Sequence, residues 1–451
     1  MTSCVVLCAG KGSKMWPYAT IRPKAMIPLC TRPLIQHTIE GLLELGMERI
    51  VIAADRFHGQ FYELFGKENR IEVIDVGQSL GSAQSLSRAL GTLQDERFMV
   101  LYGDMFLTKK ALSSFVKRAR SSSQPLLLSH RVDEGIVVNS KDGIVTGMCG
   151  QAREGSGQGF AGISCDRRML RYLNANPGYF RDVQVGVMSP LESFLEQSVA
   201  LMAQDITIEI LQLQNQDAVD LDRPWDILRA NRLLAHEMCE ELDRHELASN
   251  AQIDDSANIR GFVRLGKNSR VGRNVIIEGN AIIGDDTLIN NGAILMGNNV
   301  IGHGNLITNS CYVDKYTVVG NGCVINHCAE ICGVVFDGAY LYHYMHIYGV
   351  VGEHTDIGAA TVCGTLRFDD GRSSHLVKGR KEIPANDANA TYIGDFCRTG
   401  VNVTFWPGKR VGVYSVIGAG TILDQDVPDK TLIYPKQELL IKEWGSERYG
   451  W

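Results

Sequence analysis

The chain has 451 residues, of which 45% are hydrophobic, and a formal net charge of −6. This length exceeds one ordinary hydrophobic core, so we expect two domains. The acidic balance and the lack of a basic run argue against a nucleic-acid partner. The N-terminal stretch does not have the pattern of a signal peptide, and no apolar run approaches the roughly 20 residues that span a bilayer. We therefore predict a soluble cytoplasmic protein that binds no membrane.

Residues 1–225 alternate short apolar runs with amphipathic stretches. The apolar runs cover 4–10, 48–54, 71–76 and 97–104, and residues 33–46 have the apolar spacing of a helix. This alternation predicts a doubly wound, Rossmann-like α/β sheet. Ligands of such sheets bind beyond the carboxyl ends of the strands. Glycine-rich and acidic stretches fall at that edge, so we expect the ligand site there.

Five short motifs follow one another in this domain. They are Leu7-x-Ala9-Gly10-x-Gly12-Ser13-Lys14-Met15, Pro23-Lys24, Leu80-Gly81-Ser82-Ala83, Tyr102-Gly103-Asp104 and Asp220-x-x-Arg223-Pro224-Trp225-Asp226. Small residues after a strand let backbone N–H groups cradle phosphates, although a glycine pair alone is weak evidence. In content and order the five motifs resemble those of sugar-1-phosphate nucleotidylyltransferases.

The resemblance implies that a sugar 1-phosphate attacks the α-phosphorus of a nucleoside triphosphate, UTP or dTTP, and expels pyrophosphate. It implies Lys14 and Lys24 at the phosphates and Asp104 and Asp220 as ligands of Mg²⁺. Two carboxylates suffice because Mg²⁺ keeps several waters. The alternative for each aspartate is a strand-end residue satisfied by local N–H groups. The implied nucleotide-binding residues are Leu7, Ala9, Gly10, Gly12, Gln78, Gly81, Ser82 and Gly103.

Several positions depart from the family pattern. Lys14 stands where the family usually has Arg, which keeps the charge but loses the bidentate fork. Val76 stands where a Gln often reads the base, with Gln78 close by. Gly150 and Phe160 replace two polar sugar contacts, and Glu154 is the nearest substitute for the first. An unpaired buried sugar hydroxyl costs roughly 1–3 kcal/mol, so either the sugar differs or its binding is weak.

These departures leave a second hypothesis open. The chain could be a regulatory or binding subunit that kept the fold while its sites eroded. Such a protein would bind nucleotide or sugar without turnover. It would also associate with an active relative.

A helix is predicted between the two domains. Residues 223–245 have apolar residues at helical spacing, and 226–250 form the predicted linker. The second domain then covers 251–435, and residues 436–451 are predicted to end the chain as a short helix that caps it.

Aliphatic residues recur every six positions through the second domain. This spacing fits neither an α-helix nor a flat strand, and it predicts a left-handed parallel β-helix of hexapeptide repeats, in which three strands make one coil of about eighteen residues. Small side chains four residues later, such as Cys311 and Cys323, are predicted to be buried reduced thiols. The aliphatic residues are Ile253, Ile259, Leu265, Val271, Ile277, Ile283, Ile289, Leu295, Ile301, Ile307, Val313, Val319, Ile325 and Ile331.

The six-residue spacing fails twice. Asp337 falls where an aliphatic residue is due, and the spacing resumes out of phase at Val351, so we predict an irregular loop over 337–350. Residues 365–390 are too polar for coil, although 366–369 are similar to a Leu-Arg-Phe-Asp loop of the same family. The spacing then returns at Ile393, Thr399, Phe405, Val411, Ile417 and Leu423.

With this coil behind the first domain, the whole chain resembles the bifunctional sugar-phosphate nucleotidylyltransferase/acetyltransferases, to which the N-acetylglucosamine-1-phosphate uridylyltransferases belong. The resemblance implies a homotrimer with acetyl-coenzyme A between neighbouring coils, near Ala419 and Lys436. It implies a general base near Tyr342 or His343. A neutral imidazole suits that role, whereas a tyrosine with a pKa of about 10 does not. The alternative is an aromatic patch that packs against a neighbouring subunit.

Overall fold

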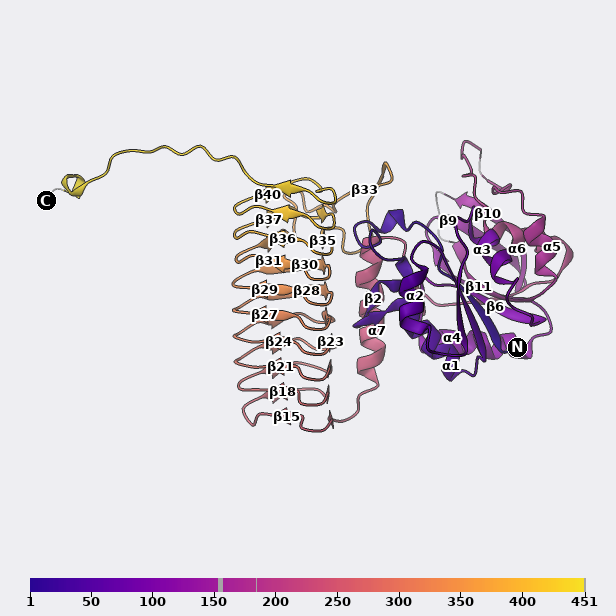
Figure 1. Cartoon of the computed structure of the whole chain (residues 1–451), viewed down its shortest axis with the longest axis horizontal. Helices are drawn as coiled ribbons and strands as arrows, with labels where there is room; N and C mark the ends of the chain where they lie inside the picture. The colour runs from indigo at the N-terminus through magenta and orange to yellow at the C-terminus, as the bar shows by residue number, and fades with distance from the viewer. Residues whose placement is uncertain (153–156, 184, 450–451) are drawn as a thin grey trace.

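The computed structural model describes residues 1–152, 157–183 and 185–449. An α/β domain lies beside a column of β-coils, and helix α7 (Pro224–Glu240) runs between the two (Figure 1). Both parts of the predicted fold class are confirmed. None of the helices in the described ranges combines the length and apolarity that crossing a membrane requires.

A nine-stranded mixed sheet forms the centre of the α/β domain. Its first four strands are parallel, as predicted from their apolar runs, and β11 joins them in the antiparallel direction. In spatial order the strands are β5 (Ile71–Asp75), β4 (Arg49–Ala54), β1 (Ser3–Leu7), β6 (Arg97–Tyr102), β11 (Gly157–Asp166), β8 (Leu126–Val132), β12 (Glu209–Gln212), β10 (Ile144–Ala152) and β9 (Gly135–Lys141).

Helices cover both faces of this sheet. One face packs against α1 (Leu34–Glu44), α2 (His58–Phe65) and α4 (Lys109–Ser121), and the other against α3 (Ser82–Ala89), α5 (Met169–Asn174) and α6 (Leu195–Asp205). A separate antiparallel pair, β7 (Met105–Leu107) and β13 (Ala218–Asp220), continues from the carboxyl end of β6. A two-stranded pair, β2 (Pro28–Leu29) and β3 (Arg32–Pro33), precedes α1. The carboxyl ends of β1, β4, β5 and β6 thus meet at one edge.

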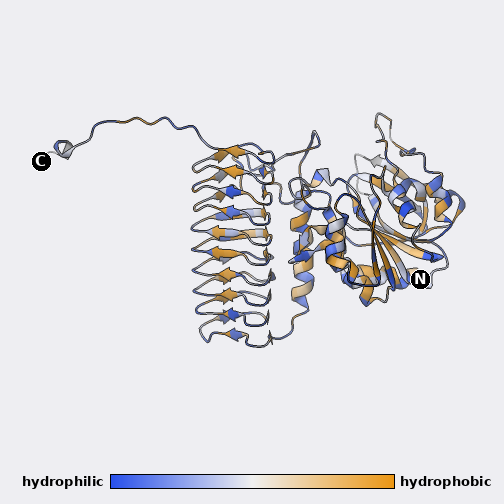
Figure 2. Cartoon of the chain, in the orientation of Figure 1, coloured by the Kyte–Doolittle hydropathy of each residue, from blue (hydrophilic) through white to orange (hydrophobic). Residues whose placement is uncertain are grey.

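The second unit is a three-sided parallel β-helix, called the prism below. In its lower part each strand pairs with the strand 18 residues later, as in Ile253 with Val271 and Val271 with Ile289. The aliphatic residues of the six-residue spacing fill the interior, together with Cys311 and Cys323, which are both fully buried and unpaired. Figure 2 shows apolar residues along most of the coils. The predicted coil geometry is confirmed.

The strands of the prism form three faces. The first face carries β14 (Glu246–Leu247), β17 (Val263–Leu265), β20 (Ala281–Ile283), β23 (Asn299–Ile301), β26 (Val318–Val319), β28 (Glu330–Val335), β30 (His346–Val351), β35 (Thr391–Ile393) and β38 (Arg410–Val411). The second carries β16 (Asn258–Ile259), β19 (Ile276–Ile277), β22 (Ile294–Leu295), β25 (Tyr312–Val313), the first halves of β28 and β30, β32 (Val362–Cys363), β37 (Thr404–Phe405) and β40 (Ile422–Leu423). The third carries β15 (Gln252–Ile253), β18 (Arg270–Val271), β21 (Leu288–Ile289), β24 (Leu306–Ile307), β27 (Val324–Asn326), β29 (Tyr340–Tyr342), β31 (Asp356–Ile357), β36 (Arg398–Thr399), β39 (Val416–Ile417) and β41 (Leu432–Ile433).

The predicted irregular loop over 337–350 is wrong. Strand β29 within it pairs with β27, and β30 pairs with β28, both at a spacing of 16 residues instead of 18. Strands β28 and β30 each bend from one face to the next at Gly333 and Gly349, whose φ angles of 131° and 137° suit glycine. A corner that is two residues shorter places Val335 and Val351 in the interior. The coil is continuous, and only the phase of the spacing changes.

The second interruption does leave the prism. Val351 pairs with Ile393 across the gap, so the coil resumes directly above. Between them, β33 (His375–Val377) and β34 (Arg380–Glu382) form an antiparallel hairpin beside the α/β domain (Figure 1).

The predicted capping helix at the C-terminus is wrong over the part of it that the structure describes. After β41 the chain runs away from the prism, and its helical structure is one 3₁₀ turn at Ser446–Tyr449 (Figure 1). Leu439, Leu440 and Ile441 of this segment are exposed, so it does not cover the last coil.

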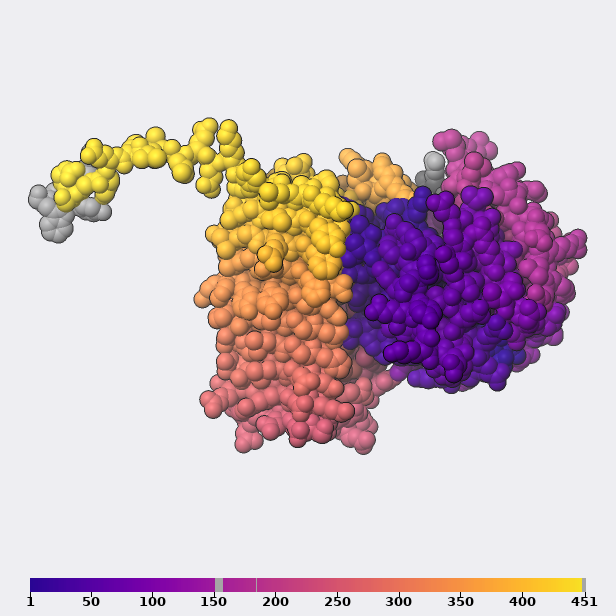
Figure 3. Space-filling model, in the orientation of Figure 1, coloured from indigo at the N-terminus to yellow at the C-terminus, as the bar shows by residue number. Residues whose placement is uncertain are grey.

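An apolar core joins the α/β domain to the first face of the prism. Ile227 and Leu234 of α7 pack in one buried cluster with Val318, Val334 and Val350 of the prism. Residues near the start of the chain meet the prism along a continuous seam (Figure 3). The first face is therefore covered within the chain.

Candidate active site

A glycine-rich turn follows β1 at the carboxyl edge of the sheet. Gly12 has a φ of 59°, and a Cβ there would lie 2.9 Å from the Cβ of Ala19. The backbone N–H of Gly10 donates to Asp55 Oδ2 at 3.1 Å. The turn therefore needs glycine for its shape.

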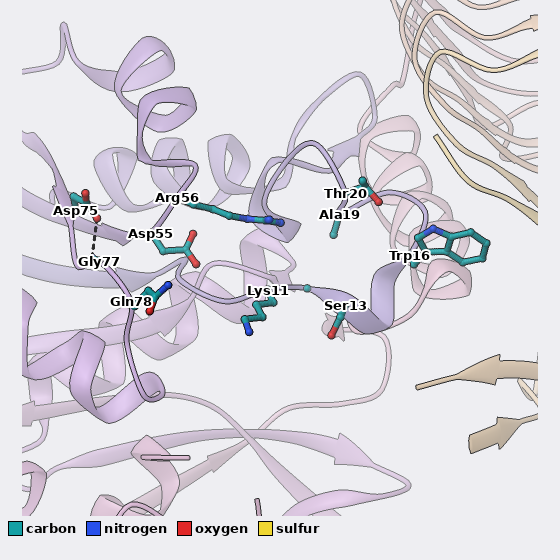
Figure 4. A pocket seen from close by; sticks show the side chains of 11 residues that line it. Lys11, Ser13, Trp16, Ala19, Thr20, Asp55, Arg56, Asp75, Gly77 and Gln78 are labelled. Atoms are coloured by element: carbon teal, nitrogen blue, oxygen red, sulfur yellow. Dashed lines mark hydrogen bonds between the residues drawn. The ribbon is translucent and has the colours of Figure 1, made fainter. Parts of the chain in front are cut away.

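A pocket of about 760 Å³ opens beside this turn (Figure 4). Its walls come from the turn after β1, from the end of β4 and from the end of β5. The pocket is lined by Lys11, Gly12, Ser13, Trp16, Ala19, Thr20, Asp55, Arg56, Asp75, Gly77 and Gln78. Of the predicted nucleotide-binding residues, Gly12 and Gln78 thus line one cavity. Val76 is 2% exposed and belongs to the core, so its side chain does not reach this pocket.

The other predicted nucleotide-binding residues border the same edge. Leu7 is buried and its carbonyl accepts from the N–H of Gly103 at 2.8 Å, and a Cβ on Gly103 would clash with the sulfur of Cys8. Gly81 has a φ of 142° and lies against the backbone of Ser193. The hydroxyl of Ser82 accepts from the N–H of Leu195 at 2.8 Å, which shows a structural role for this side chain.

Lysines and carboxylates gather next to the turn. Lys24 opens the 3₁₀ turn Lys24–Met26 and forms an ion pair with Asp104, which follows β6. The Nζ of Lys24 also lies 3.4 Å from Asp222, and the Nζ of Lys14 lies 2.8 Å from Asp222. We call Lys14, Lys24, Asp104, Asp220 and Asp222 the lysine–carboxylate cluster. The structure therefore brings both predicted lysines to one place.

The charges in the cluster stabilise one another. Burial opposes the charge on Lys24, but Asp104 and Asp222 outweigh it and hold the pKa of Lys24 above its ordinary value. Burial also acts to raise the pKa of Asp222, yet the nearby Lys24, Lys14 and Arg223 hold that pKa well below its usual range. Asp222 thus stays ionised and fixes both lysines.

Asp220 lies at the end of β13, opposite Met105 on β7. The N–H of Leu221 donates to the carbonyl of Asp104 at 3.0 Å, so the two predicted Mg²⁺ ligands are neighbours. Desolvation in the cluster and the Asp222 carboxylate raise the pKa of Asp220, although its side chain keeps contact with solvent. A divalent cation would relieve this crowding of negative charge.

The donor atoms of this cluster fit Mg²⁺. In the described ranges, no three or more His, Cys, Asp or Glu side chains enclose a space for a metal ion. Mg²⁺ needs no such enclosure, because it binds through one or two carboxylates and keeps waters. Asp104 and Asp220 supply that number of oxygen donors.

Sequence reasoning missed Asp222. The signal was available, since Asp220 and Asp222 are two positions apart in an extended segment, and such residues point to the same side. Asp226, in contrast, caps α7, because its Oδ2 accepts from the N–H groups of Arg223 at 2.7 Å and Asp222 at 3.1 Å. Burial raises the pKa of Asp226 to about 7.

The sugar-side departures have a packing explanation. A Cβ on Gly150 would lie 2.6 Å from the ring of Phe180, so no longer side chain fits there. Phe160 is 7% exposed and its ring meets that of Tyr102 edge-on at 5.7 Å. Both positions therefore lie in apolar surroundings. Glu154 lies outside the described residues.

The predicted acetyltransferase residues lie on an edge of the prism. His343 follows β29, is exposed, and stacks on His327 with ring centroids 4.4 Å apart. Tyr342 is half-buried, and its ring lies 5.5 Å from that of His343 and 6.1 Å from that of Tyr340. The aromatic patch anticipated as an alternative therefore exists.

Ala419 belongs to the same edge as His343. The third face stacks β29, β31, β36, β39 and β41 in order, so Ala419 lies three coils from His343. Lys436 lies after β41, on the segment that runs away from the prism. At a strand spacing of about 4.8 Å, three coils span about 14 Å. Ala419 and Lys436 are both exposed.

Comparisons with known proteins agree over both units. The MobA-like NTP transferase domain family matches residues 4–182. A bifunctional protein GlmU of Methanococcus maripaludis strain C7 is 30% identical over 97% of this chain and 98% of its own length. The bifunctional protein GlmU of Methanocaldococcus jannaschii is 26% identical over 97% of this chain and 99% of its own length. A bifunctional sugar-1-phosphate nucleotidylyltransferase/acetyltransferase of Sulfurisphaera tokodaii is 26% identical over 94% of this chain and 97% of its own length.

Proposed function

Because this chain belongs to the family of bifunctional sugar-1-phosphate nucleotidylyltransferase/acetyltransferases, we propose which of its residues perform each activity. The α/β domain joins a nucleoside triphosphate to a sugar 1-phosphate, forms a nucleotide sugar and releases pyrophosphate. The observation that carries the residue assignment is the ion pair of Lys24 with Asp104 beside the glycine-rich turn.

In this proposal the backbone of Gly10 and Gly12 faces the phosphates, and Gln78 faces the base of UTP or dTTP. Lys24 and Lys14 stabilise the negative charge that spreads over the α-phosphoryl group as the sugar phosphate attacks. Phosphoryl transfer needs mainly such positioning and charge neutralisation. Asp222 orients both lysines. Asp104 and Asp220 would hold Mg²⁺, which neutralises phosphate charge when bound.

The sugar site differs from the family pattern. Gly150 and Phe160 give the substrate no polar side chain, and the surroundings of both are apolar. We therefore expect a sugar 1-phosphate with fewer hydroxyl groups to bury at this side than N-acetylglucosamine 1-phosphate has.

The test is pyrophosphate release over a panel of nucleoside triphosphates and sugar 1-phosphates with Mg²⁺. Asp104→Ala is expected to abolish turnover. Asp166→Asn is the matched control, because Asp166 lies at the opposite edge of the same sheet, where its carboxylate pairs with Arg168. Absence of turnover with every pair, or equal turnover of wild type and Asp104→Ala, contradicts the assignment.

A regulatory role is the second candidate for this domain. The buried Val76 and the apolar surroundings of Gly150 and Phe160 favour it, since three family contacts to substrate are replaced. A purified homo-oligomer with full turnover rules it out, whereas binding of nucleotide without turnover supports it.

The prism is proposed to transfer an acetyl group from acetyl-coenzyme A. His343 and Ala419 share one exposed edge, which supports binding of acetyl-coenzyme A along it, and His343 or Tyr342 would accept the proton of the acceptor amine. The test is acetyl-coenzyme A consumption with amino-sugar phosphates. Activity that survives both His343→Ala and Tyr342→Phe removes these two residues from the proposal.

A homotrimer is proposed through the two faces of the prism that the α/β domain leaves open. Both carry half-buried aliphatic side chains that point outward, such as Ile294 on the second face and Leu306 on the third. A neighbouring prism would bury them. Light scattering that gives a monomer at micromolar concentration contradicts this.

A further inference from the structure

The hairpin of β33 and β34 leaves the prism and lies against the α/β domain. In the space-filling view, residues of its part of the chain meet those of the N-terminal domain near the top of the seam (Figure 3). Its base is fixed on α7, since the ring of His375 lies 5.0 Å from that of Trp225. His375 is 2% exposed, and its Nε2 lies 2.8 Å from the carbonyl oxygen of Ala388. These contacts hold the base of the hairpin against α7.

Two arginine–carboxylate contacts tie the hairpin to the α/β domain. Arg223 donates from Nε and Nη2 to the two oxygens of Glu382 at 2.6 and 2.9 Å, a bidentate fork that lysine could not make. Both side chains are largely buried, 11% and 14% exposed. Arg380 lies 2.7 Å from Glu134, which also lies 3.6 Å from Arg223.

These contacts connect directly to the lysine–carboxylate cluster. The Nη1 of Arg223 forms an ion pair with Asp222, which holds Lys14 and Lys24. The groups joined by these ion pairs are four cations and four anions. They are Lys14, Lys24, Arg223 and Arg380 against Asp104, Asp222, Glu134 and Glu382. Loss of Glu382 removes the bidentate partner of the mostly buried guanidinium of Arg223.

The turn of the hairpin carries a lysine that acts on the charge of Glu192. Burial raises the pKa of Glu192, while Lys378 on the turn and Lys14 in the cluster both act to lower it. A Cβ on Gly81 would lie 2.8 Å from Cγ of Glu192, so Glu192 packs against the predicted nucleotide-binding segment. The hairpin therefore extends from Arg223 to the surroundings of Glu192.

We propose that this hairpin is a positioning element of the nucleotidyltransferase site and that Glu382 is its positioning residue. The proposal rests on the proposed function of the lysine–carboxylate cluster. Glu382 fixes the guanidinium of Arg223, Arg223 fixes the carboxylate of Asp222, and Asp222 sets where the two lysines meet the phosphates. Nucleotidyl transfer in the α/β domain therefore depends on an insertion in the prism of the same chain.

The first test compares the kinetics of three variants. Glu382→Gln removes the charge at constant shape, and kcat is expected to fall about 10- to 100-fold, as for other groups that orient residues in contact with the reacting groups. KM should change less, because misaligned lysines lose transition-state contacts before ground-state ones. Glu382→Asp should retain intermediate activity. Asp369→Asn, an exposed carboxylate on the same insertion, should match wild type.

A double-mutant cycle separates positioning from general damage. Lys14 and Glu382 are connected through Asp222 and Arg223, so Glu382→Gln should add little to the loss in Lys14→Ala. The proposal is overturned if the two substitutions lower kcat by factors that multiply in the double variant, or if kcat is unchanged in Glu382→Gln.

Trypsin gives a readout that needs no activity. Lys378, Arg380 and Lys381 are exposed in the hairpin, and wild type and Asp369→Asn should be cleaved there slowly. Glu382→Gln should be cleaved faster, because the hairpin loses its main contact. Equal cleavage rates in wild type and Glu382→Gln overturn the docking. A wild type without turnover but with this difference in cleavage instead counts against the proposed function.

Discussion

Replacing Arg22 with methionine should weaken the attachment of the α/β domain to the prism. Arg22 follows the glycine-rich turn, and its Nη2 donates to Glu353 at 2.5 Å and to Asp395 at 3.0 Å. The side chain of Arg22 is 7% exposed and that of Asp395 is fully buried. Burial opposes the charge on Arg22, but Asp395 and Glu353 hold the pKa of Arg22 above its ordinary value.

The magnitude follows from the burial of the three groups. Methionine fills most of the space of the arginine stem, so the main loss is electrostatic. Asp395 would remain buried without a cation, and removal of one partner from a buried pair costs about 3–5 kcal/mol. Glu353 is about a third exposed, so water takes over much of its solvation and it adds little.

The assay is equilibrium unfolding in urea, followed by circular dichroism and by tryptophan fluorescence, because the two units need not unfold in one step. Arg70→Met is the matched control. Arg70 pairs with Glu68 at 2.9 Å on the surface, where water competes for both groups, so loss of this pair should change stability little. A decrease in the unfolding free energy of less than about 1 kcal/mol in Arg22→Met would refute the reasoning, because it would mean that water solvates Asp395 in the variant. Asp395→Asn in the Arg22→Met background should recover part of the loss, because no buried charge then remains.

Three further outcomes are expected. Gly103→Ala should lower the unfolding free energy by about 1–3 kcal/mol in thermal melts, because its Cβ meets the sulfur of Cys8, whereas Gly147→Ala has open space and should not. Burial raises the pKa of Glu196 to about 7, so the folded state favours the protonated acid. The stability from this group is present at low pH and is lost as pH rises through about 7, and Glu196→Gln should flatten that dependence in urea titrations at several pH values. Asn305→Ala should destabilise the prism by about 1–3 kcal/mol or more in the same assay, because the side chain accepts from one buried N–H and donates to one buried carbonyl.

The sequence alone determined the architecture of both units. In the prism every sixth side chain must be apolar because it faces the same narrow interior, and this requirement repeats so often that the spacing is unmistakable. In the α/β domain the apolar runs predicted buried strands, and β1, β4, β5 and β6 lie side by side in the parallel part of the sheet. Both results depend on local pattern, which each segment of chain carries by itself.

The six-residue count led to a wrong prediction over 337–350, because two corners of the coil are shorter there. Gly333 and Gly349 each let a strand bend onto the next face, and the coil loses two residues there without leaving the prism. A count in sixes assumes corners of constant length, so it assigned a loop to regular coil. The packing explanation for Gly150 was equally hidden, since it depends on Phe180, which is distant in sequence.

Only the tertiary structure decided how the hairpin of the prism contacts the groups around the lysine–carboxylate cluster. Arg223 and Glu382 are separated by 159 positions along the chain, and nothing in the spacing of either segment links them. An ion pair between distant segments requires two groups to be held together by packing elsewhere, here by the apolar face of α7 against the prism. The spacing of apolar residues shows which side chains each segment buries. A contact such as Arg223–Glu382 depends instead on how the two units are positioned relative to each other.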